Sequence, residues 1–383
     1  MDDRLAILSG GTPGESGPMT ENQGFGCYLF LGRGDYVLSR VPLDQIDPKW
    51  RKPFTVSPHA ADWSFSWGLA EWQEKLRFLH GLGARRIYMI MNAFELPYPS
   101  QSYPELVEPD HVNVQREFFG KLLEFARGLG LEMIASFSTT GHCDRALELY
   151  PELSGRHADG NRWQCAMCHN NPQAREYVRT VITEVLTRYE GFSGVYLHPP
   201  EVNEYCWCDH CQQLYRTQTG QELTAQDPAT RLIWHWQTAF GLLEELRQLA
   251  LSFDPCFPIS ICTLGATWEP IFPQLHPLLH PDVTLLHWDY GAFNPAAEER
   301  IGRRLALFGS GGHRLGFISS VRFSMAGLDM QELRDHTARK VAFVRSRGVQ
   351  EIVFFVGPVW FPESIRAATA GVGIRASHVT LSR

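Results

Sequence analysis

The sequence predicts an α/β fold, a (β/α)8 barrel with a short N-terminal extension and a cysteine-rich loop after the fourth strand. Short apolar runs, rich in β-branched and aromatic residues, alternate with amphipathic helical segments along most of the chain. This alternation is typical of a parallel sheet. Seven clear strands and one uncertain opening strand match the eight units of a barrel. No glycine-rich phosphate loop follows an early strand, as an open nucleotide-binding sheet would require.

Composition narrows the class of protein. The chain has 383 residues, of which 44% are hydrophobic and 20% charged, as in an ordinary globular protein. Its net charge of −7 and the lack of a basic stripe argue against a nucleic-acid partner.

The sequence contains no run of about 18 apolar residues, so no membrane span is predicted. The N-terminus lacks an export signal pattern, so we expect a cytoplasmic protein, in which clustered cysteines favour metal over disulfides. Homo-oligomer formation is left open.

The beginning of the chain is predicted in three parts. Residues 1–23, rich in Gly, Pro, Ser and Thr, predict a flexible leader. Residues 24–50 predict an N-terminal cap, or a strand pair, on a single barrel domain that covers residues 24–383. The aromatic-rich stretch 54–67 is the candidate for the first barrel strand.

The remaining elements follow in order. The predicted strands comprise residues 87–91, 132–137, 194–198, 258–264, 283–288, 315–320 and 351–356. The predicted helices comprise residues 69–82, 114–129, 174–189, 232–251 and 328–348. Gly83 and Gly130 directly follow the first two helices, where glycine favours the left-handed conformation that ends a helix.

The carboxyl ends of the strands carry the candidate chemistry, because reacting groups of such barrels stand there. Four carboxylates follow strands and are candidate catalytic groups: Glu201 and Glu204 after the fourth strand, Glu269 after the fifth and Asp289 after the sixth. Polar and aromatic residues at the same ends are candidate substrate contacts: Asn92, Glu95, His142, His198, Trp268, His287, Trp288, Arg322 and Trp360. Paired carboxylates with aromatic residues suit glycoside cleavage, so a carbohydrate is the expected substrate.

The cysteines predict a metal site. Cys165 and Cys168 are separated by two residues, and Cys206, Cys208 and Cys211 follow at ligand spacing. A tetrahedral zinc ion needs four thiolates, so the spacing offers five candidates for one structural site.

Residues from about 149 to 220 resemble the corresponding stretch of glycoside hydrolase family 42 β-galactosidases. The segments that carry the resemblance are Tyr150-Pro-Glu, Asp159-Gly160, Cys168-His-Asn-Asn-Pro172, Arg175-Glu-Tyr177, the strand at 194, and Cys206, Cys208 and Cys211. The resemblance implies that Cys168, Cys206, Cys208 and Cys211 bind structural zinc, with Cys165 the alternative ligand. It also implies that Glu201 is the general acid/base at the end of strand four.

The chain departs from this family at two positions. Pro200 precedes Glu201 where the family has Asn, and an Asn-Glu pair occurs instead at 203–204, so Glu204 remains an alternative acid. The seventh predicted strand ends Ser319-Ser-Val-Arg322, without the carboxylate that retaining relatives place there. The second catalytic group is therefore Asp289, Glu269 or an acetamido group of the substrate.

Three functional hypotheses follow. The first is a zinc-braced glycoside hydrolase-like enzyme that uses Glu201. The second is a sugar-binding barrel without turnover, which the acid-free seventh strand favours. The third is a metal-dependent enzyme in which His142, His198 and His287 converge on a second, catalytic metal.

Overall fold

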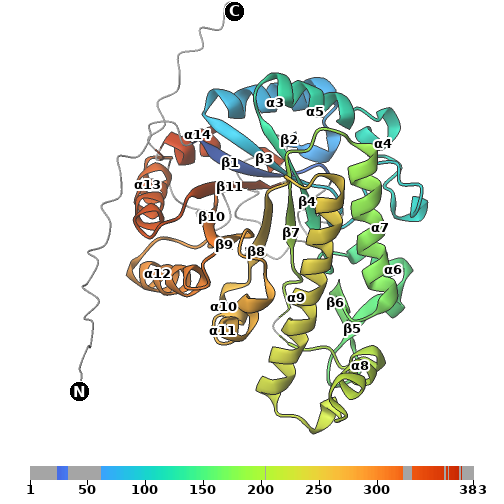
Figure 1. The fold of residues 1–383 in the computed structure, drawn as a ribbon. Helices are drawn as coiled ribbons and strands as arrows, with labels where there is room; N and C mark the ends of the chain where they lie inside the picture. Colours follow the sequence, from blue (N-terminus) through green and yellow to red (C-terminus); the bar gives the residue numbers. More distant parts are fainter. Residues whose placement is uncertain are drawn as a thin grey trace, which may run out of the picture.

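The computed structural model describes residues 24–32, 62–202, 204–321, 330–357, 359–360, 362–370 and 372. Within these residues eight parallel strands form a closed barrel in the order β1-β11-β10-β9-β8-β7-β4-β3. The strands are β1 (Phe25–Phe30), β3 (Ala84–Ile90), β4 (Glu132–Ser138), β7 (Gly194–His198), β8 (Ile259–Thr263), β9 (Thr284–Trp288), β10 (Arg314–Ser320) and β11 (Glu351–Gly357). The predicted (β/α)8 architecture is confirmed (Figure 1).

Helices surround the barrel (Figure 1). They are α3 (Leu69–Gly81), α4 (Val112–Arg116), α5 (Phe119–Gly128), α6 (Asp144–Leu149), α7 (Pro172–Arg188), α8 (Asp209–Thr219), α9 (Pro228–Phe253), α10 (Gly265–Trp268), α11 (Phe272–Leu275), α12 (Pro295–Gly309), α13 (Met330–Ser346) and α14 (Pro362–Ala370). Short 3-10 turns are η2 (Ser64–Ser66), η3 (Pro104–Leu106), η4 (Pro151–Leu153), η5 (Leu223–Ala225) and η6 (His276–Leu278). No helix among the described residues is both long enough and apolar enough to cross a membrane.

The first barrel strand differs from the prediction. β1 lies in the predicted cap and pairs with both β3 and β11, so it closes the barrel. Every residue of β1 is buried, as a strand covered on both faces requires. In the stretch 54–67, residues 54–61 lie outside the described part. The two-residue β2 (Asp62–Trp63) pairs antiparallel with β12 (Val359–Trp360), away from the barrel.

Two of the predicted helices differ from their expected bounds by more than two residues. The segment predicted as one helix, 114–129, is divided into α4 and α5 because Glu117 adopts a left-handed conformation (φ 44°). The Asn113 side chain accepts a hydrogen bond from the Phe119 N–H at 2.9 Å, which gives a partner to one of the free N–H groups at the start of α5. Helix α9 begins four residues before its predicted start, at Pro228, because Asp227 caps it through the N–H groups of Ala229 and Thr230.

The barrel interior and the layer outside it are separate apolar clusters. Buried side chains inside the barrel are Tyr28, Phe30, Tyr88, Ile90, Ala93, Ile134, Tyr196, Cys262, Leu286, Ile318, Val353 and Phe355. The amino ends of the strands are closed by Arg86, which bonds Glu132 at 2.6 Å and Glu351 at 2.9 Å. The interior is therefore packed, and the carboxyl ends form the mouth at which chemistry is possible.

A hairpin extends the loop after the third barrel strand. β5 (Ser154–Arg156) pairs antiparallel with β6 (Arg162–Met167), and both lie near α6 and α8 at the lower right of Figure 1. This hairpin leads directly into Cys168 and the start of α7. It also contacts the cysteine-rich loop after β7, since the Trp207 N–H donates to the Arg156 carbonyl at 3.0 Å.

Candidate functional site

Glu201 and His198 form an ion pair at the carboxyl end of β7. Strand alternation places His198 on the inward face of β7, two residues after the buried Tyr196. Pro199 and Pro200 then end the strand, because proline has no N–H to continue the ladder. Glu201 turns back toward the strand, and its Oε1 lies 3.4 Å from His198 Nε2. The structure thus keeps the predicted acid at the mouth.

The charges of this pair stabilise each other. Burial opposes ionisation of Glu201, but the hydrogen bond and charge of His198, with the charge of His142, lower the pKa of Glu201 to about 2. Burial also disfavours the charged imidazolium of His198, but its interactions with Cys262 and Glu201 raise the pKa of His198 to about 10. At neutral pH the pair is a carboxylate and an imidazolium that together hold one proton.

His142 completes a three-residue group, the mouth cluster, with His198 and Glu201. Ligand atoms of these three side chains all lie within 4.8 Å of one another. The rings of His142 and His198 have centroids 5.4 Å apart. Burial, together with the charge of His198, lowers the pKa of His142 to about 4, so its imidazole is neutral at pH 7. The mouth cluster therefore combines an anion, a cation and a neutral base.

Aromatic side chains of the barrel interior lie beside the mouth cluster. Tyr28 contacts Tyr196 with ring centroids 5.5 Å apart, and Trp288 contacts Tyr290 at 5.1 Å. Burial, followed by the charges of Cys262 and Glu201, raises the pKa of Tyr28 well above its ordinary value. Tyr28, Tyr290 and Cys262 were not among the predicted site residues. The inward alternation of β1 and β8 would have pointed to Tyr28 and Cys262 once these strands were assigned.

Asn92 and Glu95, both predicted as substrate contacts, are buried after β3. Asn92 exchanges two hydrogen bonds of 2.8 Å with the backbone of Ser138, so its amide connects the ends of β3 and β4. Glu95 lies against Gly32 at the end of β1 and is 3% exposed. Asn92 therefore acts on the mouth through the backbone it holds in place.

The other three candidate carboxylates lie in ion pairs away from Glu201. Asp289 projects outward from β9, and its carboxylate lies 2.7 Å from Arg300 and 3.5 Å from the fully buried Lys340. Glu269 pairs with Arg303 and Arg304 of α12. Glu204 lies 2.8 Å from His157 at the β5–β6 hairpin. The side chains that shift the pKa of Glu201 are His198 and His142, and each of the three acids is paired with other basic residues.

Several other predicted contacts also lie outside the mouth. His287 faces outward from β9, is fully buried and bonds Thr263 Oγ1 through Nδ1 at 2.9 Å. The predicted convergence of His287 with His142 and His198 is therefore wrong, since successive residues of a strand face opposite sides and Trp288 is the one that faces the barrel interior. Trp268 packs against Phe240 and Trp236, and Trp360 packs against Trp67 and Phe78, all in the outer core. Trp288 lies at the mouth, and Arg322 lies outside the described residues.

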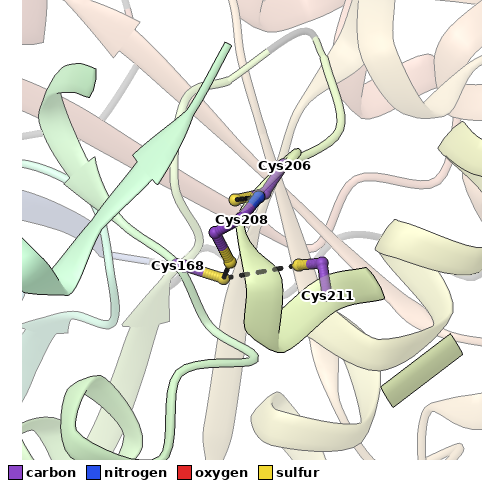
Figure 2. Close-up of side chains that lie close together, drawn as sticks. All are labelled: Cys168, Cys206, Cys208 and Cys211. Atoms are coloured by element: carbon purple, nitrogen blue, oxygen red, sulfur yellow. Dashed lines mark hydrogen bonds between the residues drawn. The ribbon is translucent and has the colours of Figure 1, made fainter. Parts of the chain in front are cut away.

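A second group, the cysteine cluster, consists of Cys168, Cys206, Cys208 and Cys211. Figure 2 shows the four side chains converging from the segment before α7 and from the start of α8. Cys168 Sγ lies 3.5 Å from both Cys208 Sγ and Cys211 Sγ, too far for a disulfide. Cys165 is exposed and outside this group.

The cysteine cluster fits a tetrahedral metal. With Zn–S bonds of about 2.3 Å, the ligand sulfurs of a tetrahedron lie about 3.8 Å apart, close to the observed spacing. Cys206 Sγ accepts hydrogen bonds from the N–H groups of Arg156 and Cys208, at 3.2 and 3.4 Å. Hydrogen bonds from the other three thiols lower the pKa of Cys208, which favours a thiolate at this position. Four soft ligands leave no open position, as in structural sites.

Comparisons with known proteins give similar folds only. No family model matches the sequence, and no curated protein matches it. Similar solved structures include the β-galactosidase of Halorubrum lacusprofundi (TM-score 0.56, 13% identity, covering 80% of this chain and 56% of that chain). The β-galactosidase of Bacillus circulans sp. alkalophilus gives a TM-score of 0.58 at 12% identity, covering 80% of this chain and 54% of that chain.

A third solved structure is a glycosidase of another kind. The β-N-acetylhexosaminidase of Bacteroides fragilis gives a TM-score of 0.56 at 10% identity and covers 92% of this chain and 66% of that chain. The chain spans little more than half the length of both β-galactosidases. At these identities the similarity establishes the barrel fold that this chain shares with several glycosidases.

Proposed function

We propose that this protein is a carbohydrate-active enzyme that cleaves a glycosidic bond, with Glu201 as general acid/base. The observation that carries the proposal is the Glu201–His198 pair, held at the carboxyl end of the fourth barrel strand beside an aromatic interior. The family 42 resemblance of residues 149–220 and the glycosidase folds found by comparison support the same reaction class.

The single proton of the pair is the catalytic proton. In the free protein it lies on His198, because the pKa of Glu201 is lowered and that of His198 raised. A sugar bound at the mouth excludes water. Loss of solvation makes the charged forms of Glu201 and His198 less favourable relative to their neutral forms. The proton then moves to Glu201, and Glu201 donates it to the leaving oxygen as the glycosidic C–O bond breaks.

The partner of Glu201 is best sought in the substrate. Asp289, Glu269 and Glu204 are each held in ion pairs elsewhere. We therefore favour, among the predicted alternatives, assistance by a 2-acetamido group of the sugar. Its carbonyl oxygen would attack the anomeric carbon while the leaving oxygen takes the proton from Glu201, and water would later open the ring so formed.

The four-cysteine cluster has a structural role in this proposal. Cys168, Cys206, Cys208 and Cys211 would hold Zn²⁺, which would connect the loop after β7 to the start of α7. The connection would fix the chain that follows Glu201 and would not take part in the reaction.

A panel of 4-nitrophenyl glycosides, with and without a 2-acetamido group, tests the proposal. We expect turnover of an acetamido sugar, and in Glu201→Gln a loss of kcat by a factor of about 10²–10⁴. Glu204→Gln is the matched control and should change kcat less than about twofold, because Glu204 pairs with His157 outside the mouth. Undiminished activity in Glu201→Gln would remove Glu201 from the role.

A second candidate function is sugar binding without turnover. It is favoured by the observation that the three other candidate acids are each held in an ion pair with a residue other than His198 or His142. Sugar-dependent thermal stabilisation with no turnover on the whole panel would establish this candidate. If no sugar gives either thermal stabilisation or turnover, both candidate functions are contradicted.

A further inference from the structure

We propose that the mouth cluster of His142, His198 and Glu201 is a binding site for a divalent transition-metal ion. Among the described residues, only two groups of His, Cys, Asp and Glu bring at least three ligand atoms within 4.8 Å of one another, the cysteine cluster and this one. The mouth cluster differs from the predicted three-histidine site, since Glu201 takes the place of His287.

The observed spacing fits coordination. Zinc binds imidazole nitrogen and carboxylate oxygen at about 2.0–2.2 Å, so two ligands of a tetrahedral ion lie about 3.4 Å apart. His198 Nε2 and Glu201 Oε1 are 3.4 Å apart. This separation is longer than the mode for a direct N–H···O bond, about 2.9–3.0 Å. The pair is thus spaced as two ligands would be.

The third ligand is held in place by its loop. His142 has a left-handed backbone (φ 47°), which is uncommon for a residue other than glycine. Its carbonyl accepts a hydrogen bond from the Phe94 N–H at 2.7 Å, and the Gly141 carbonyl accepts one from Ser138 Oγ at 2.6 Å. Such a conformation persists when surrounding contacts fix it, and it is common at ligand sites.

The loops after β4 and β7 also contact each other directly. A Cβ on Gly141 would meet Pro200 Cα at 2.9 Å, so the backbones pack closely at this point. The Thr139 N–H donates to the His198 carbonyl at 2.9 Å. These contacts bring His142 to the two ligands on the other loop without any movement of the backbone.

The ligand types specify the class of ion. Two imidazoles and one carboxylate suit Zn²⁺, Fe²⁺ and similar divalent ions, whereas Mg²⁺ and Ca²⁺ prefer oxygen ligands. Three protein ligands leave a coordination position open toward the mouth, unlike the closed set of four thiolates. His198 is the shielded ligand of this site, since its side chain is 11% exposed and its Nδ1 has no hydrogen-bond partner, whereas the Glu201 side chain is 43% exposed.

A metal ion bound to the mouth cluster would regulate the proposed reaction. A metal would take the lone pairs of Glu201 and His198 that hold the catalytic proton, so it would inhibit glycoside cleavage. This consequence rests on the proposed function, whereas metal binding itself does not.

Equilibrium dialysis of the full chain against Zn²⁺, followed by elemental analysis in the absence of sugar, tests the inference. We expect two zinc ions per chain. His142→Ala should keep one ion and weaken the second site at least about tenfold. Glu201→Gln should also weaken it, because a neutral amide is a poorer ligand. His280→Ala is the matched control and should keep both ions, since His280 pairs with Asp282 outside the mouth cluster.

Co²⁺ substitution identifies each site by its spectrum. The ion in the cysteine cluster should give an intense sulfur-to-metal charge-transfer band, which Cys208→Ser should remove. The ion at the mouth should give only weak visible bands, which His142→Ala should remove. A single ion per chain, or a second ion unaffected by both His142→Ala and Glu201→Gln, would overturn the inference. Two ions without any glycosidase activity would contradict the proposed function and leave the inference intact.

Discussion

The cysteine cluster and the mouth cluster both take residues from the short segment 198–211, yet their surroundings differ. The cysteine cluster has four soft ligands, three of them fully buried, and two backbone N–H groups donate to the sulfur of Cys206. The mouth cluster has two imidazoles and a carboxylate and lies beside aromatic rings. The side chain of Glu201 is 43% exposed. A closed set of ligands stabilises the fold, whereas an open set can meet a substrate.

The largest expected effect is the loss of protein stability when the cysteine cluster is disrupted. Cys208→Ser should release zinc and lower the free energy of unfolding by more than about 4 kcal/mol, because metal binding is coupled to folding. Elemental analysis measures the zinc content, and chemical denaturation measures the free energy of unfolding. Cys165→Ser, with its exposed thiol, should change stability by less than about 0.5 kcal/mol. Equal stability and retained zinc in Cys208→Ser would contradict the ligand assignment.

The next effect concerns the carboxylate of Asp289, which the sequence placed among the catalytic candidates. Asp289→Ala should lower the free energy of unfolding by about 3–5 kcal/mol, because it leaves the buried charge of Lys340 without its carboxylate. Chemical denaturation measures this loss, and the exposed Asp282→Ala is the control. A stable variant that loses activity would instead place Asp289 in the reaction.

A smaller effect is the pH dependence of His287. Burial, followed by the charge of Arg304, lowers the pKa of His287 to about 3. The unfolded chain therefore binds a proton below pH 6.5 that the folded chain does not bind until about pH 3. The stability contributed by His287 is present above pH 6.5 and is lost as the pH falls, by up to about 1.4 kcal/mol per pH unit. Denaturation of His287→Gln between pH 4 and pH 7 should show a shallower decline than the wild type.

The smallest expected effect is on sugar affinity at the mouth. Trp288→Ala should weaken binding about two- to tenfold, since an aromatic contact contributes about 0.5–1.5 kcal/mol. Calorimetric titration with the best sugar of the panel measures it. Stability should change little compared with Asp289→Ala, because Trp288 is only partly buried. Unchanged affinity would remove Trp288 from the sugar site.

The strand assignments show which predictions depend on local pattern. Six of the seven clear predicted strands overlap barrel strands β3, β4, β7, β8, β9 and β10, and the seventh overlaps β11. Each is a short apolar run that ends at a polar residue or a turn. β1 was not assigned to the barrel, because a buried strand near the N-terminus has no preceding helix to mark it as part of the alternation.

The sequence by itself determined seven of the eight barrel strands and brought out the thiols that form the cysteine cluster, because periodicity and ligand spacing are local properties of the chain. Only the tertiary structure decided which strand-end side chains meet. Neighbouring residues of one strand face opposite sides, so Trp288 lies inside the barrel while His287 and Asp289 lie outside. His142 reaches His198 and Glu201 because two loops, far apart in sequence, pack at Gly141 and Pro200.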